Sequence, residues 1–286
     1  MSTVAAGLRV RGQISKQGDD RMKIRILGPL EVRTDLGEEV TPHPLKLRSL
    51  LAALCINSGR PVTASHLINV LWSDRPPRTA ATALQVYVSK LRKHFHNVGI
   101  DPGVLTTTPA GYVLRPAGPV LDRDHFDSLV TRARAAAGAG CTETAASAFS
   151  QALALWSGPA LADLRDVPAL RDYARQMDER RNSIYEQWLE LEIDLGHHSM
   201  LTSELYGLIA EKPIWENLYF FLMISLYRSG RISECLEVYN RIRRILIEEL
   251  GMEPSARLQS LHRAVLSREP WLDPSAAQLA AGAAAR

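Results

Sequence analysis

Hydrophobic and polar residues alternate in the first stretch of the chain that has a regular pattern. From Lys23 to Val32 charged and apolar residues take turns until Gly28 and Pro29 interrupt them. A period of two residues is typical of a half-buried strand, and Gly-Pro is a turn signal. The pattern therefore predicts two strands joined by a turn, with a third short strand near 38–41.

The spacing of apolar residues then changes to that of α-helices. Leu84, Val88, Leu91 and Phe95 recur at intervals of four, three and four, so they share one face of a helix. The same periodicity, with turn signals between the segments, predicts helices over 45–57, 64–71 and 75–96 and a β-hairpin of 104–107 with 112–115.

Strands, three helices and a terminal hairpin follow one another in the order of a winged helix. This fold is a variant of the helix-turn-helix, in which the recognition helix enters the major groove of DNA. We therefore expect 75–96 to be the recognition helix and the hairpin to be the wing.

The face of 75–96 opposite its apolar stripe suits DNA in composition, because it has no acidic residue. Lysine and arginine neutralise phosphates, whereas glutamine, serine and valine can contact base edges or a thymine methyl group. A basic amphipathic helix is more often an ordinary surface helix, but its place in a winged helix favours DNA. We expect phosphate contacts from Arg78, Lys90, Arg92 and Lys93, and base contacts from Thr82, Gln85, Val86 and Ser89.

The predicted wing offers hydroxyl groups and a glycine at its tip. Thr106, Thr107 and Thr108 can donate hydrogen bonds, and Gly111 permits a close approach. We expect the wing to contact the adjacent minor groove or backbone, the alternative being a plain solvent-exposed turn. The set of expected DNA contacts also includes Tyr112 in the hairpin and Lys46 and Arg48, which the pattern directs outward.

After a short linker at 117–120 the pattern is helical almost throughout. Antiparallel helix pairs with short turns resemble tetratricopeptide units, whose arrays offer concave protein-binding surfaces. The predicted fold is mainly α with a small β component: an N-terminal winged helix-turn-helix with antiparallel sheet and wing, then an all-α tetratricopeptide-like domain. The expected segments are a disordered leader at 1–21, a DNA-binding domain at 22–116, a helical domain at 121–270 and a flexible tail at 271–286. Met22, which opens the first patterned segment, is a candidate start residue. Helices in the second domain are expected at 124–137, 142–156, 168–195, 199–211, 215–229, 232–249 and 255–267.

Charge is distributed unevenly between the two predicted domains. Residues 21–116 contain 13 Lys and Arg against 6 Asp and Glu, whereas residues 121–270 contain 17 against 22. A basic N-terminal part joined to an acidic C-terminal part suggests a module that binds a polyanion and a module that binds a partner.

Candidate chemistry is sparse, so we predict that the protein is not an enzyme and has no metal or cofactor. Cys55, Cys141 and Cys235 are far apart in helical apolar contexts and are interpreted as buried reduced thiols. His197-His198 has no accompanying ligand cluster. No secretory signal or membrane span is apparent, so we expect no membrane association and a cytoplasmic, nucleoid-associated protein. Asp163, Asp166 and Asp172 are interpreted as surface charge.

Several motifs together resemble the Streptomyces antibiotic regulatory protein (SARP) family. They are Met-Lys-Ile-Arg-Ile-Leu-Gly-Pro-Leu-Glu-Val from Met22, Leu-Ile-Asn-Val-Leu-Trp at 67–72 before Pro76-Pro77, Leu-Gln-Val-Tyr-Val-Ser-Lys-Leu-Arg at 84–92, and Gly-Tyr-Val-Leu at 111–114. The second half is similar at 228–239 and 249–254. Cys235 stands where the family often has alanine. Larger relatives add an ATPase module, but no Gly-x-x-x-x-Gly-Lys-Ser/Thr motif occurs in this sequence.

The resemblance implies an OmpR-type winged helix followed by a bacterial transcriptional activation domain. It implies an activator of a secondary-metabolite (antibiotic) gene cluster that binds direct repeats in promoter DNA as side-by-side protomers, a homodimer on DNA. It also implies contact with RNA polymerase and its sigma factor. In OmpR-type relatives the loop before the recognition helix is the activation surface. We expect Asp74 and Arg75 to face polymerase, with Trp72 in the core.

Two other functions fit the residues. One is a helical-repeat scaffold whose winged helix mediates protein contacts, and the other is a ligand-gated repressor. Salt-dependent binding to promoter DNA would distinguish the scaffold, and run-off transcription would distinguish the repressor.

Overall fold

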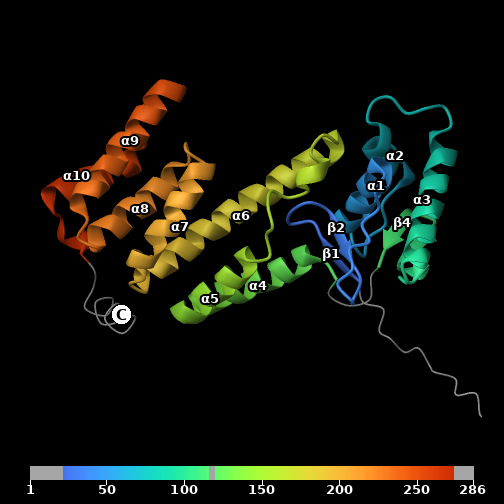
Figure 1. Ribbon diagram of the computed structural model, residues 1–286, viewed down its shortest axis with the longest axis horizontal. Coiled ribbons are helices and arrows are strands. Elements are labelled where there is room, and N and C mark those ends of the chain that lie inside the picture. The colour runs from blue at the N-terminus through green and yellow to red at the C-terminus, as the bar shows by residue number, and fades with distance from the viewer. Residues whose placement is uncertain (1–21, 116–119, 274–286) are drawn as a thin grey trace, which may run out of the picture. The chain divides into compact units, whose positions relative to one another are not determined.

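A computed structural model describes residues 22–115 and 120–273, and its chain divides into two compact units (Figure 1). Of the described residues, the first unit has 22–24, 31–115 and 120, and the second has 25–30 and 121–273. The described part is mostly helical, with two small antiparallel sheets, as predicted. The expected leader at 1–21 and most of the linker lie outside the described residues.

Two short strands open the described chain, in agreement with the alternating pattern. Strand β1 (Lys23–Arg25) pairs with β2 (Glu31–Arg33). The third strand expected near 38–41 does not form, and only an isolated bridge joins Arg33 to Glu39. Val40 donates its N–H to the Val32 carbonyl, so this segment is joined to β2 by single hydrogen bonds rather than as a third strand.

Three helices and a hairpin complete the first unit. They are α1 (Leu45–Ile56), α2 (Ala64–Trp72), α3 (Ala80–Asn97), the short 3₁₀ turn η1 (Pro102–Val104), β3 (Leu105–Thr108) and β4 (Gly111–Leu114). Thr63 caps α2 by accepting the His66 N–H. Helix α3 begins at Ala80 rather than at 75, because Pro76 and Pro77 cannot continue a regular helical turn. Trp72, expected in the core, is only half-buried.

The second unit is an array of helices in which neighbours along the chain pack together (Figure 1). Helix α4 packs on α5, α7 on α8 and α8 on α9. The helices are α4 (Asp122–Gly138), α5 (Thr142–Leu153), α6 (Pro168–Asp194), α7 (His198–Glu211), α8 (Glu216–Arg228), α9 (Ile232–Leu250) and α10 (Ala256–Ser267), with 3₁₀ turns η2 (Ala162–Leu164) and η3 (Pro270–Leu272).

The segment 25–30 belongs by its contacts to the helical unit, although the sequence assigned it to the DNA-binding domain. The Asp122 carboxylate accepts the N–H groups of Ile26 and Leu27 at 3.0 Å. Asp163 accepts the Leu30 N–H at 2.7 Å, so its interpretation as surface charge is wrong. Burial raises the pKa of the Asp122 carboxyl, and the N–H donors offset part of that rise.

Two further expectations about the helical unit need correction. Residues 271–273 are not part of a free tail, because Leu272 is buried and its carbonyl accepts a hydrogen bond from Arg228. Cys141 is exposed, since it lies in the turn before α5 rather than inside a helix. Cys55 and Cys235 are buried, and burial raises the pKa of Cys235 to about 12, so its thiol stays protonated.

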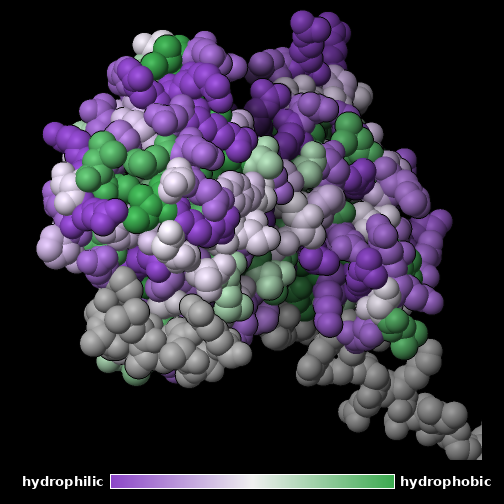
Figure 2. Space-filling model, turned by 60° about the vertical axis from the view of Figure 1, so that its left-hand side comes forward, coloured by the Kyte–Doolittle hydropathy of each residue, from purple (hydrophilic) through white to green (hydrophobic). Residues whose placement is uncertain are grey.

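The face of the molecule seen in Figure 2 is mostly hydrophilic, with hydrophobic patches among the polar residues. In the helical unit the exposed large hydrophobic residues include Met200, Ile214, Ile247 and Leu250. Among the described residues, no helix is long and apolar enough to cross a membrane.

Candidate nucleic-acid interface

Helix α3 has one buried face and one exposed face, as its sequence predicts. The predicted stripe is confirmed, because Leu84, Val88, Leu91 and Phe95 are each at most 1% exposed. These side chains anchor α3 in the core of the first unit. The opposite face is open to solvent, and its exposed residues are Thr82, Gln85, Val86, Ser89, Lys90 and Lys93.

The electrostatic environment of this face is positive. Helices α1, α2 and α3 contain no acidic residue. Over the ranges that the structure describes, no carboxylate forms an ion pair with Arg78, Lys90 or Lys93. The Lys90 ammonium lies 5.7 Å from the centre of the Tyr87 ring. Cations without acidic partners remain available to attract a polyanion.

Arg92 differs from the two lysines, because its guanidinium bonds to the hairpin. Its Nε donates to the Leu105 carbonyl at 2.9 Å, and its Nη2 donates to Thr107 Oγ1 at 2.8 Å. The structure therefore places Arg92 between α3 and β3 instead of leaving it free for phosphate. Thr107 remains exposed beside it.

The tip of the hairpin packs on the connection between α1 and α2. Tyr112 is 9% exposed and exchanges both backbone hydrogen bonds with Val62, at 2.8 and 2.9 Å. A Cβ on Gly111 would lie 2.0 Å from the Val62 carbonyl oxygen, so the close approach at this glycine is to protein backbone. The expectation of DNA contacts from Gly111 and Tyr112 is therefore not supported by their surroundings. Thr108 donates to the Gly111 carbonyl at 3.1 Å.

The outward projection predicted for Lys46 and Arg48 is wrong, because both are half-buried. The Lys46 ammonium donates to the Leu71 carbonyl and lies 5.4 Å from the centre of the Trp72 ring. It therefore ties α1 to the C-terminal end of α2, where the last carbonyls of a helix attract a cation.

Sequence reasoning did not select two exposed cations at the base of the hairpin. Arg60 and Arg115 adjoin a backbone hydrogen bond from Gly59 to the Leu114 carbonyl, 2.9 Å long. This long-range bond brings two chain segments together, and no local pattern reports it.

The loop before α3 presents Asp74 and Arg75 to solvent. It leaves α2 through Ser73, whose φ of 51° is unusual for a residue other than glycine. The Arg75 N–H donates to the Trp72 carbonyl at 3.1 Å. Both side chains predicted to meet polymerase are therefore accessible.

Among residues 22–115 and 120–273, no group of three or more potential metal ligands occurs.

Comparison with known families assigns a class to each unit. Residues 38–114 match the model described as transcriptional regulatory protein, C terminal, and residues 121–266 match the bacterial transcriptional activator domain. A winged helix of the OmpR type joined to this helical domain defines a class of transcriptional regulators. The chain belongs to the SARP family within this class.

Individual relatives agree with the family. The chain is 36% identical to the regulatory protein DnrI of Streptomyces peucetius, over 92% of this chain and 98% of DnrI. It is 38% identical to the regulatory protein AfsR of Streptomyces coelicolor, over 88% of this chain but only 25% of AfsR. The structure of Mycobacterium tuberculosis EmbR in complex with a low-affinity phosphopeptide superposes with a TM-score of 0.80 at 35% identity, over 93% of this chain and 69% of EmbR.

Proposed function

We propose that the protein is a cytoplasmic, sequence-specific DNA-binding activator of a secondary-metabolite gene cluster. The observation that carries the proposal is the exposed, acid-free face of α3, with Lys90 and Lys93 unpaired and Gln85 accessible between them and the helix start. Membership of the SARP family supports the kind of gene under control.

In the proposed complex α3 lies in the major groove. Lys90, Lys93 and Arg78 neutralise phosphates and fix the register of the helix on the duplex. Thr82, Gln85, Val86 and Ser89 lie on the N-terminal and central turns, which in helix-turn-helix proteins contact base edges. Thr107 and the exposed end of the wing contact the flanking backbone or minor groove.

Activation follows from how the bound protomers meet the transcription machinery. We propose that a homodimer occupies direct repeats with its protomers side by side. Asp74 and Arg75 then face RNA polymerase or its sigma factor. A stiff, proline-containing loop loses little conformational entropy on meeting a partner, which favours a contact surface there. The acidic helical unit supplies a second polymerase contact or holds the adjacent protomer.

The first test combines footprinting on promoter DNA with run-off transcription by purified polymerase. Protection of two direct repeats and stimulated transcription are expected. Binding that is independent of salt concentration would contradict a phosphate interface and favour the scaffold alternative. Protection with reduced transcription would favour the repressor.

The second test separates activation from DNA binding. Asp74→Ala/Arg75→Ala is expected to bind the promoter with nearly unchanged affinity and to lose stimulation of transcription. Arg132→Ala/Glu143→Ala, which removes one exposed cation from α4 and one exposed acid from α5, is the matched control and should keep both the affinity for the promoter and the stimulation of transcription. If both activities of the loop variant fall together, the loop belongs to the DNA interface.

A further inference from the structure

The helical unit contains an open groove of about 1570 Å³ that the DNA-binding proposal does not use. It is lined by the segment after α5, by one face of α6, by the connection between α7 and α8, and by the end of α9. Its size and openness suit an extended chain better than a compact small molecule, since small-molecule sites are usually enclosed and smaller.

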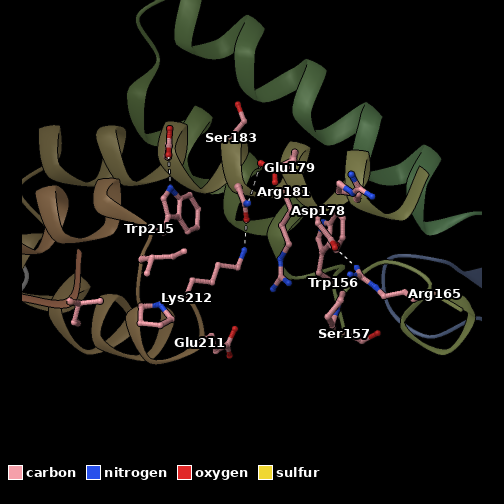
Figure 3. A pocket seen from close by; sticks show the side chains of 18 of the residues that line it. Trp156, Ser157, Arg165, Asp178, Glu179, Arg181, Ser183, Glu211, Lys212 and Trp215 are labelled. Atoms are coloured by element: carbon pink, nitrogen blue, oxygen red, sulfur yellow. Dashed lines mark hydrogen bonds and ion pairs between the residues drawn. The ribbon is translucent and has the colours of Figure 1, made fainter. Parts of the chain in front are cut away.

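Two tryptophans lie on either side of two cations in this groove. Arg181 and Lys212 extend into the space between the indole rings of Trp156 and Trp215 (Figure 3). The Arg181 guanidinium lies 5.2 Å from the Trp156 ring centre, and the Lys212 ammonium lies 4.9 Å from that of Trp215. The Trp215 Nε1 donates to Glu186 on α6 at 3.0 Å, which fixes the second indole against the same helix.

Neither cation has an acidic partner. Across the described residues, no carboxylate pairs with Arg181 or Lys212, and the only side-chain hydrogen bond of Lys212 is to Asn182. The buried Nε of Arg181 and the buried Nε1 of Trp156 have no hydrogen-bond partner. Burial and, to a smaller extent, the nearby Arg181 lower the pKa of Lys212, and the carboxylates of Asp178, Glu179 and Glu211, which form no ion pair with it, offset part of that shift. Buried donors and neighbouring like charges without a partner favour an added anion at this point.

The carboxylates of the groove are either engaged or at its rim. Asp178 binds Arg165 and accepts the Ala160 N–H, and Glu186 accepts from Trp215 and Asn217. Glu179, Glu211 and Glu249, which are exposed, would repel a continuous polyphosphate such as single-stranded RNA. An isolated carboxylate between apolar groups would meet the cations and avoid these acids.

We propose that this groove binds an extended peptide of a protein partner, with an acidic side chain against Arg181 and Lys212 and flanking apolar side chains against Trp156 and Trp215. From Arg181 to Glu186 the α6 axis advances by roughly 7–8 Å, and residues two apart on a strand are separated by about 7 Å. An apolar side chain two residues from the acid therefore matches the advance along α6 from Arg181 to Glu186, which holds Trp215. The proposal goes beyond DNA binding and does not depend on it.

The test measures binding of a labelled, capped pentapeptide, Leu-Ala-Glu-Ala-Leu, to the full chain by fluorescence anisotropy. Two control peptides replace the central Glu by Gln or both Leu by Ser. Saturable binding of the first peptide, at least tenfold tighter than of either control, is expected.

Variants of the two cations test whether the peptide binds in this groove. Lys212→Gln and Arg181→Gln should each weaken binding at least tenfold, and Lys212→Arg should retain it. Arg244→Gln, which removes an exposed cation of α9 outside this groove, should change nothing. Thermal melting checks that each variant is folded, and Lys212→Arg distinguishes lost charge from lost packing. No saturable binding, equal binding of the Gln peptide, unchanged binding by both variants, or displacement by a short oligonucleotide would each overturn the proposal.

Discussion

The two units use the same charged residue types in opposite ways. In the helical unit several cations form ion pairs with acids, as in Arg180–Asp127, Arg231–Glu234 and Arg243–Glu253. On α3 the cations Lys90 and Lys93 have no acid near them, because the three helices of that unit have none. The difference shows that a cation is available for binding when its own unit leaves it unpaired, whatever the net charge of the chain.

The groove at Arg181 and Lys212 is a place where the helical unit resembles the DNA-binding unit in this respect. Both sites combine unpaired cations with apolar or aromatic groups. They differ in the acids around them, which are absent from α1 to α3 and abundant at the rim of the groove. This difference favours a polyanion at the first site and an isolated carboxylate at the second.

The largest effect on stability is expected for a carboxylate that accepts hydrogen bonds only from its own unit. Asp122→Ala removes the acceptor of the Ile26, Leu27 and Arg123 N–H groups. Leaving buried donors unsatisfied costs about 1–3 kcal/mol each, so the free energy of unfolding should fall by about 3 kcal/mol or more. Denaturant unfolding measures it. Asp124→Ala, at an exposed acid of the same turn, should cost below about 1 kcal/mol; equal losses would contradict the assignment.

The next prediction tests the unpaired cations directly. Lys90→Ala/Lys93→Ala should lower the magnitude of the slope of log affinity against log salt by about 2, since each lost phosphate contact lowers it by about 1. Affinity for promoter DNA measured over a range of salt concentrations gives the slope. The control Arg241→Ala/Arg244→Ala removes two exposed cations from the helical unit. If the control shifts the slope as much, the net charge of the chain and not the position of the cations on α3 decides binding.

The sequence predicts features that depend on local spacing, but it does not predict contacts between segments that are distant in the chain. The buried face of α3 follows from the spacing of Leu84, Val88, Leu91 and Phe95, because helical periodicity is local. The partners of Arg92 and Lys46 could not be predicted, since Leu105 and Leu71 come from other elements that only the fold brings near. Periodicity reports which face points outward, but it does not report which outward side chain bends back to a carbonyl.

The same reason explains why the sequence did not indicate that residues 25–30 belong to the helical unit. Local alternation correctly predicts β1 and β2, but the N–H groups between the strands are accepted by Asp122 and Asp163, about a hundred residues or more along the chain. At Gly111 the sequence indicated a close approach, and the structure shows that the approaching group is the Val62 backbone.

A smaller effect is expected for a neutral residue on the exposed face of α3. Gln85→Ala should change the relative affinities of promoter variants by about 1–3 kcal/mol at one base step, because an amide can pair with a base edge in two places. Competition binding with single-base variants measures it. Thr131→Ala, at an exposed hydroxyl of the helical unit, is the control. A uniform loss across all variants would make Gln85 a positioning residue rather than a base reader.

The smallest effect on DNA binding is expected at Arg92. This residue is a cation of the DNA-binding unit, but its hydrogen bonds are to other residues of the same unit. Its guanidinium joins α3 to β3 through Leu105 and Thr107. Arg92→Ala should lower the free energy of unfolding by about 1.5–3 kcal/mol, the usual net value of a hydrogen bond from a charged group. The salt slope of DNA binding should change by clearly less than 1, because no phosphate contact is lost. Lys90→Ala is the matched variant, and it should do the reverse: little change in unfolding and a slope lower by about 1. Denaturant unfolding and DNA affinity over a range of salt concentrations, measured for both variants, test these two expectations. If Arg92→Ala changes the slope as much as Lys90→Ala, the guanidinium leaves the hairpin when DNA binds, and pairing within the free protein does not determine which cations meet phosphate.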